Sequence, residues 1–464
     1  MIKTKLHTKL NKDLKRLGVR YAGVYLVNKF FIKINTGKHR LEIPSYNFKK
    51  NTFSDDDQLK LQMENYPTLY HEYIHYVHEV STMAGIAQFQ YNVLKRSIFS
   101  HFVEHDHPSV VNPITGEMKR KFDSLQKTID ILTGGFNEDM EGKIVYQIDD
   151  IQFMKFPCYE PADDSSRMVD IPVIIFTYLD RKTNKSKQDS ACFGKYFLYE
   201  GLAHNLDQIT SIQGGLAPTP LLHIAPEYRM LELVALKIFP GIDRRSLLEL
   251  ASMSLGWFNC GERFIKALME AATIPHLPGY MFEIQNELHA HLTAHRNVVR
   301  KMLADIKGIF KYRSELHTAA GHLCKVMLNS YDQRIKKPLF EIEVTFNRQQ
   351  DRLREYVDLC QMVYVFADDH EVFMRDFAGS YLPKRLRSKL LTFMCHVDYA
   401  QTPIGSINNH CCPLFTFCPH QRRIEKPEQC KKKPWLAFDD QPKYGWCEYG
   451  LGVAYMTGED KPKK

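Results

Sequence analysis

Two histidines and a glutamate within one short segment have the residue types and spacing of a metal-dependent hydrolytic site. In His71-Glu72-Tyr73-Ile74-His75 the histidines are four residues apart, and residues at this spacing share one face of an α-helix. Two imidazoles can therefore bind one metal ion, with Glu72 within reach of a water molecule on that ion. Zinc lowers the pKa of bound water to about 7, and a carboxylate then acts as its general base.

The surrounding residues favour a buried helix. Asn65 is a plausible N-cap, and Pro67 is tolerated in a first helical turn. The alternative is a core helix whose histidines are satisfied by ordinary hydrogen bonds. The uncharged residues around the two histidines are Leu69, Tyr70, Tyr73, Ile74, Tyr76 and Val77.

A catalytic zinc site needs a third protein ligand and keeps a fourth position open. His78 and Glu79 are close in sequence, but residues seven or eight apart are separated by about 10–12 Å along a helix axis. Because zinc–ligand bonds are near 2 Å, one ion cannot bind ligands spread over more than two turns. The third ligand must come from another part of the chain.

A second segment, Glu200-Gly201-Leu202-Ala203, begins after 124 residues that follow His75. With these two motifs the chain resembles a gluzincin-type zinc metallopeptidase of the peptidase MA clan, in which a later helix carries a glutamate ligand, often within Glu-Gly-Leu-Ala. The resemblance implies that His71, His75 and Glu200 bind zinc and that Glu72 is the catalytic base. It covers the two motifs and the strand–helix–helix order within about residues 20–215.

The sequence departs from that family in two respects. The long spacing implies an insertion between the motifs, including the strands expected within residues 143–179. Four residues after the glutamate, where relatives often have an acid that orients a histidine ligand, this chain has His204. We expect His204 to orient a ligand or to be a ligand itself. His204, Tyr199 and several later residues are candidates to stabilise the oxyanion of the reaction.

A second candidate metal site lies near the end of the sequence. Five of the 11 cysteines fall within residues 410–447, and small segments with little apolar content often use zinc as a structural element. The spacings lack a Cys-x-x-Cys pair, and the alternative is a set of reduced, packed cysteines. The expected structural zinc ligands are Cys412, Cys418, Cys430 and Cys447, with Cys411, His410 and His420 as substitutes.

Residue patterns predict the elements that position these sites. Strands are expected within residues 21–34, 143–156 and 171–179, whereas residues 101–142 look irregular because of their prolines and glycines. A basic amphipathic helix is expected near residues 2–17. Further helices are expected at residues 66–100, 196–212, 226–238, 244–256, 261–272, 280–308, 313–330, 346–377 and 384–395.

Composition limits the class of protein. The 464 residues are 44% hydrophobic and 25% charged, which excludes disorder over most of the chain. The longest apolar run, residues 171–179, is too short to span a bilayer, so no transmembrane segment is expected. The N-terminal residues lack the apolar core of a secretory signal. We therefore expect a cytoplasmic protein whose cysteines are free thiols or metal ligands.

Positive charge is concentrated at one end of the chain. Residues 1–50 contain 13 Lys/Arg and two acids, whereas the whole chain has a net charge of +8. This segment is either a solvated lysine face or a contact to nucleic acid, an anionic lipid or an acidic partner.

The sequence as a whole predicts an α+β protein in four parts. These are a basic β-containing segment (1–60), a zincin-like catalytic core (61–215), a mostly helical domain (216–400) and a cysteine-rich tail (401–464). The expected function is that of a zinc-dependent endopeptidase, a hydrolase that cleaves a protein substrate through zinc-bound water activated by Glu72. The alternative is a non-catalytic, zinc-stabilised protein that binds nucleic acid or a partner protein through its basic N-terminus and its tail.

Overall fold

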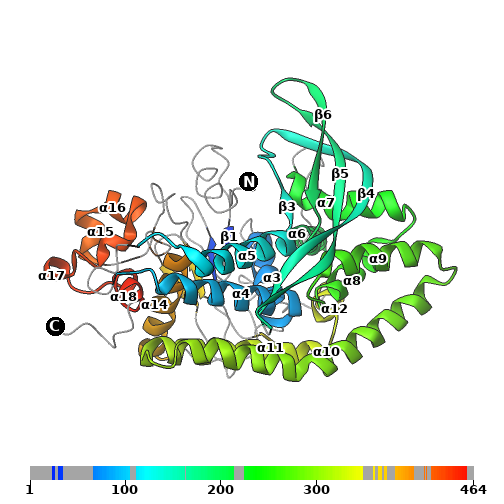
Figure 1. Cartoon of the computed structure of the whole chain (residues 1–464). Coiled ribbons are helices and arrows are strands. Elements are labelled where there is room, and N and C mark those ends of the chain that lie inside the picture. Colours follow the sequence, from blue (N-terminus) through cyan, green and yellow to red (C-terminus); the bar gives the residue numbers. More distant parts are fainter. Residues whose placement is uncertain are drawn as a thin grey trace, which may run out of the picture.

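The computed structural model confirms the α+β class within the part of the chain that it describes (Figure 1). None of the helices in that part is long and apolar enough to cross a membrane. The expected helix near residues 2–17, Asn65, His410 and Cys411 lie outside the described residues. The structure describes residues 23–26, 30–34, 66–104, 111–161, 163–213, 224–347, 359–360, 364–367, 370–373, 382–401, 412, 414, 418 and 420–456.

Two consecutive helices replace the single stretch expected at residues 66–100. They separate at Thr82, whose hydroxyl donates to the His78 carbonyl (2.6 Å) and accepts from the Gly85 N–H (3.1 Å). Thr82 therefore caps the second helix. The longer helices are α3 (Tyr66–Ser81), α4 (Met83–Ser100), α5 (Gly116–Thr133), α6 (Lys195–Gln213), α7 (Pro226–Ile238), α8 (Arg244–Ser254), α9 (Cys260–Thr273), α10 (Leu277–Ile309), α11 (Ser314–Lys336) and α14 (Lys384–Gln401).

The C-terminal part consists of short helices. Figure 1 shows them grouped at one end of the molecule, with the strands β3 to β6 at the other end and the long helix α10 along one side. These C-terminal elements are α15 (Gln421–Glu425), α16 (Pro427–Lys432), η3 (Pro434–Ala437), α17 (Gln441–Tyr444) and α18 (Glu448–Ala454). A further short helix, α12 (Phe340–Phe346), follows α11.

A four-stranded antiparallel sheet leads into the helix that carries Glu200. Its order is β3-β6-β5-β4, and its hairpin turns contain Asp164 and Asn184 at φ of 52° and 53°, a conformation that Asp and Asn tolerate. Because β6 ends only three residues before α6 begins, the sheet fixes where α6 starts. The strands are β3 (Gly135–Phe136), β4 (Lys143–Glu160), β5 (Ser165–Asp180) and β6 (Lys185–Cys192).

A second sheet joins distant parts of the sequence. Its order is β1-β2-β7-β8, and β2 pairs in parallel with β7, so that Phe31 is opposite Tyr364. The two central strands thus come from opposite ends of the chain. The strands are β1 (Gly23–Leu26), β2 (Phe31–Ile34), β7 (Tyr364–Ala367) and β8 (His370–Phe373).

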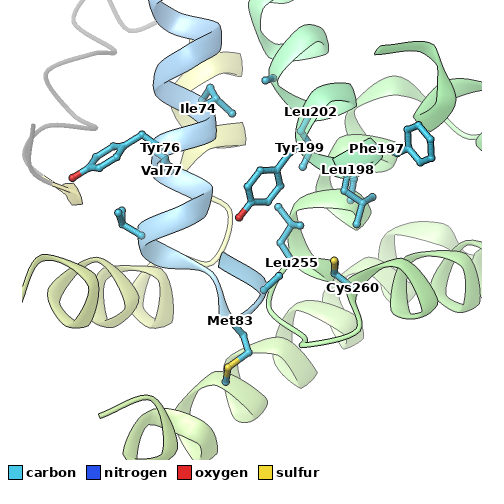
Figure 2. Close-up of a cluster of buried hydrophobic side chains, with 14 of the residues drawn as sticks. Ile74, Tyr76, Val77, Met83, Phe197, Leu198, Tyr199, Leu202, Leu255 and Cys260 are labelled. Atoms are coloured by element: carbon cyan, nitrogen blue, oxygen red, sulfur yellow. The ribbon is translucent and has the colours of Figure 1, made fainter. Parts of the chain in front are cut away.

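One large hydrophobic core holds α3 against α6. Ile74 and Val77 of α3 and Leu202 of α6 are fully buried in it, and Figure 2 shows these side chains between the two helices. Gly201, next to Glu200, allows α7 to approach α6 closely, because a Cβ there would lie 2.5 Å from the Cβ of Leu231. Gly201 therefore permits close packing of α6 against α7 directly beside the polar Glu200.

Two expectations from the sequence are wrong. Residues 101–142 are not irregular throughout, because α5 lies between Gly116 (φ 62°) and Gly134 (φ 69°). The helix begins at Gly116 and Gly134 follows its last residue, so these glycines mark the two ends of the helix and do not prevent it. Residues 346–377 are not one helix, because β7 and β8 lie within them. β7 pairs with β2, and β8 pairs with β7; local periodicity does not reveal a pairing between segments so far apart in the sequence.

Candidate metal centre

Helix α3 places His71 and His75 on one face. The two Nε2 atoms are 3.1 Å apart, and the ring centroids are 4.8 Å apart. Both histidines, and Glu72 between them in sequence, are buried but not fully, with 7–8% of each residue exposed. The four-residue spacing therefore produces the convergence that the sequence predicts.

Helix α6 brings Glu200 to the same point. Its Oε2 atom lies 3.6 Å from Nε2 of His71 and 3.3 Å from Nε2 of His75. One atom from each of these residues lies within 4.8 Å of the other two, and no other described His, Cys, Asp and Glu residues form such a group. The Glu200 side chain remains 20% exposed, so the histidine–glutamate site (His71, His75 and Glu200) has an open side.

These separations suit a tetrahedral zinc ion. Ligands bound at about 2.0–2.1 Å in tetrahedral geometry lie about 3.3 Å from one another. The three measured distances of 3.1, 3.3 and 3.6 Å surround that value. Two imidazoles and one carboxylate are also a donor set that catalytic zinc sites use. The residues present therefore fit zinc.

The electrostatics of the site favour a cation. Burial by itself lowers the pKa of His71, but the carboxylates of Glu200, Glu72 and Asp207 outweigh it and raise that pKa to about 9. Burial raises the pKa of Glu200, but His75 and His71 outweigh it and hold that pKa well below its usual range. Negative charge from three carboxylates thus acts on one buried imidazole.

Asp207 and Tyr228 also lie near His71, and the sequence analysis assigned neither of them to the site. Burial raises the pKa of Asp207 to about 6, with Glu72 adding to the shift. The ring of Tyr228, on α7, packs edge-on against His71 at 5.4 Å. Asp207 is seven residues after Glu200, which is two helical turns, so periodicity could have indicated it. No local signal marks Tyr228.

The structure places His204 and Tyr199 differently. The His204 ring stacks on Tyr228 at 5.0 Å, and burial, with the charges of His71 and Arg244, lowers the pKa of His204 to about 4. The Tyr199 hydroxyl lies 3.5 Å from the Thr82 hydroxyl, beyond the C-terminal end of α3 (Figure 2). His204 therefore lies one ring away from His71, whereas the Tyr199 ring stacks on His75 at 6.2 Å with its hydroxyl near Thr82.

A second polar cluster lies further along α3, around His78, two helical turns after His71. His78 and Glu341 are both fully buried, with 3.3 Å between Nε2 and Oε1. Arg334 donates to the same Oε1 atom at 3.1 Å, and the Ser252 hydroxyl does so at 2.5 Å. We call His78, Arg334, Glu341 and Ser252 the buried ion-pair network. Burial lowers the pKa of His78 to about 4 despite its bond to Glu341.

The predicted cysteine ligands lie far along the chain from these two clusters. Cys412, Cys418, Cys430 and Cys447 line one small cavity together with His420. All four cysteines are free thiols. Within the described residues, the ligand atoms of His71, His75 and Glu200 lie close together, whereas the four cysteines share a cavity without meeting the same distances.

Comparison of the chain with protein-family models, with curated proteins and with solved structures found no match.

Proposed function

We propose that this protein is a zinc-dependent endopeptidase of the gluzincin type, which hydrolyses peptide bonds of a protein substrate. The observation that carries the proposal is the convergence of His71, His75 and Glu200 at separations of 3.1–3.6 Å. Glu72 lies beside this group, and its charge acts on His71 and on Asp207. A purely structural metal site does not need a fourth ionisable group in that position.

The three ligand residues would hold the zinc ion, and the Glu200 side chain is partly exposed. Zinc held there would supply Lewis-acid chemistry, polarising a carbonyl oxygen and lowering the pKa of a water molecule. The gluzincin resemblance from the two sequence motifs agrees with this donor set. Asp207, close enough to act on His71 electrostatically, is suited to keep that imidazole in position.

Glu72 has the role of general base. Its carboxylate takes a proton from the attacking water and later transfers it to the nitrogen of the leaving amine. The ring of Tyr228 packs against His71, which makes its hydroxyl the best candidate for donating a hydrogen bond to the developing oxyanion. His204 stacks on the Tyr228 ring at 5.0 Å and so helps to fix the orientation of Tyr228.

The test separates metal binding from chemistry. We expect His71→Ala/His75→Ala to lose zinc at this site, and Glu72→Gln to retain zinc but lose at least about 100-fold in hydrolysis, the lower range for general-base catalysis. The assay incubates the protein with a mixture of unfolded polypeptides and identifies new N-termini by mass spectrometry. Glu232→Gln, a matched change on α7, should retain full activity. A fully active Glu72→Gln protein would rule out the mechanism.

A further inference from the structure

Four cysteines from the C-terminal part of the chain surround one small cavity. Cys412, Cys418, Cys430 and Cys447 all line it, and its volume of about 20 Å³ is enough for a single ion or water molecule. The backbone N–H of Cys412 donates to the carbonyl of Cys430 at 2.9 Å. This hydrogen bond joins two segments that are 18 residues apart in the sequence.

Each of the four sulfurs accepts an N–H hydrogen bond from the chain around it. The backbone N–H groups of Leu414 and His420 donate to the sulfurs of Cys412 and Cys418, each two residues before the donor. The Gly450 N–H donates to the sulfur of Cys447 at 3.3 Å. Burial raises the pKa of all four thiols, and these hydrogen bonds oppose that effect, because they stabilise a thiolate more than a thiol.

The fourth sulfur has a charged donor. Arg422 is 2% exposed, and its guanidinium donates to the sulfur of Cys430 at 3.1 Å and to the Asp440 carboxylate at 2.7 Å. A buried guanidinium directed at a cysteine sulfur is the partner that a negatively charged sulfur requires. Cys395 is fully buried in the same hydrophobic cluster as Cys412, but it does not line the cavity.

We propose that Cys412, Cys418, Cys430 and Cys447 bind one zinc ion as a closed structural site. Four thiolates in tetrahedral geometry are a common structural zinc site, and soft sulfur donors select zinc over magnesium or calcium. The sulfurs lie further apart than the ligand atoms of the histidine–glutamate site, so binding draws them inward to zinc–sulfur bonds of about 2.3 Å. The proposal does not depend on peptidase activity.

Zinc at this position would hold the short C-terminal helices as one unit against the rest of the protein. Cys412 belongs to the same hydrophobic cluster as Phe99 and Val103, which lie at the end of α4. His396 of α14 contacts the Gly452 carbonyl at 2.7 Å, and Gly452 has no room for a Cβ, which would lie 2.8 Å from the His396 nitrogen. The site therefore connects the tail to the helix that follows α3.

The test counts zinc per chain after metal-free protein has been reconstituted with zinc and freed of excess. We expect two zinc ions in the wild type and one in His71→Ala/His75→Ala. Adding Cys447→Ser to that double variant should remove the remaining ion, whereas adding Cys192→Ser, at a half-buried position on β6, should leave it. A double variant that holds no zinc, or a Cys447→Ser protein that still holds one, overturns the proposal. Because the two sites have separate ligands, loss of one proposal leaves the other testable.

Cobalt reconstitution excludes misfolding as an explanation. The double histidine variant keeps all four cysteines, and cobalt bound to it should show strong thiolate-to-metal charge-transfer absorption, which zinc then displaces. Absence of that absorption overturns the proposal. So does thiol titration of the denatured, metal-free wild type if it shows that these cysteines form disulfides. Iron in place of zinc in the purified protein would overturn the identity of the metal.

Discussion

Helix α3 carries histidines into two polar clusters that differ in their balance of charge. In the histidine–glutamate site, Glu200, Glu72 and Asp207 raise the pKa of His71 to about 9. In the buried ion-pair network, burial lowers the pKa of His78 to about 4 although Glu341 is bonded to it. His71 and His78, seven positions apart on one helix, therefore have pKa values shifted in opposite directions.

The difference lies in what balances the carboxylate. Arg334 neutralises Glu341 in the network and holds its pKa below the usual range against the effect of burial, so His78 can remain neutral. In the histidine–glutamate site the charges that act on His71 come from carboxylates, and a proton or a metal ion must balance them. A divalent cation would complete this site in the way that Arg334 completes the network.

The largest expected effect concerns the stability of the network. We expect Glu341→Gln to lower the free energy of unfolding by about 3–5 kcal/mol, because the buried Arg334 loses its only bonded carboxylate in the network. Chemical denaturation measures the change. The control is Glu343→Gln, the same substitution on the same helix at a half-buried position, with an expected change below about 1 kcal/mol. Equal losses for the two variants would contradict the assigned charge balance.

The matching change in the histidine–glutamate site should affect metal binding instead. We expect Glu200→Gln to weaken zinc binding by more than about 100-fold, since changes that affect only the surroundings of a ligand already cost 10–100-fold. Competition with a chelator of known affinity measures this loss. Glu232→Gln on α7 should bind zinc normally. Unchanged affinity in Glu200→Gln would remove Glu200 from the ligand set.

A smaller effect is expected from the tyrosine next to His71. Tyr228→Phe keeps the ring that packs against His71 but loses the hydroxyl. We expect kcat to fall by about 100-fold, as for loss of one oxyanion donor, with zinc affinity unchanged. Tyr146→Phe, at a 45% exposed position on β4, should have normal kcat. A normal kcat in Tyr228→Phe would show that another group donates the hydrogen bond to the oxyanion.

The smallest expected effect is the dependence of stability on pH. The folded pKa of His78, about 4, is below its usual value of 6.5, so the unfolded chain binds a proton more readily. Stability is therefore complete above pH 6.5 and declines as pH falls toward 4. Between pH 7 and 5 this contributes about 2 kcal/mol. Denaturation at both pH values should show a loss in the wild type that exceeds the loss in His78→Gln by this amount, and equal losses would refute it.

Local patterns predicted elements well where burial follows helical periodicity. The expectation for residues 226–238 matches α7, and that for 196–212 differs from α6 by one residue at each end. The same approach failed at α5 and at β7, and it did not predict β6. α5 lies between glycines that resemble breakers, β7 depends on pairing with β2, and the polar residues of β6 carry little strand signal.

The sequence by itself determined which residue types can bind a metal ion at the candidate site and on which face of α3 the two histidines lie. His71 and His75 share a face because helical periodicity is a local property of the backbone. Tertiary structure decided what surrounds them, because it results from packing between residues far apart in the chain. That packing brought Glu200 within 3.6 Å of His71, Tyr228 against the same ring and Glu341 to His78. It also gathered four cysteines around one cavity, although no pair of them has the spacing of a local zinc motif.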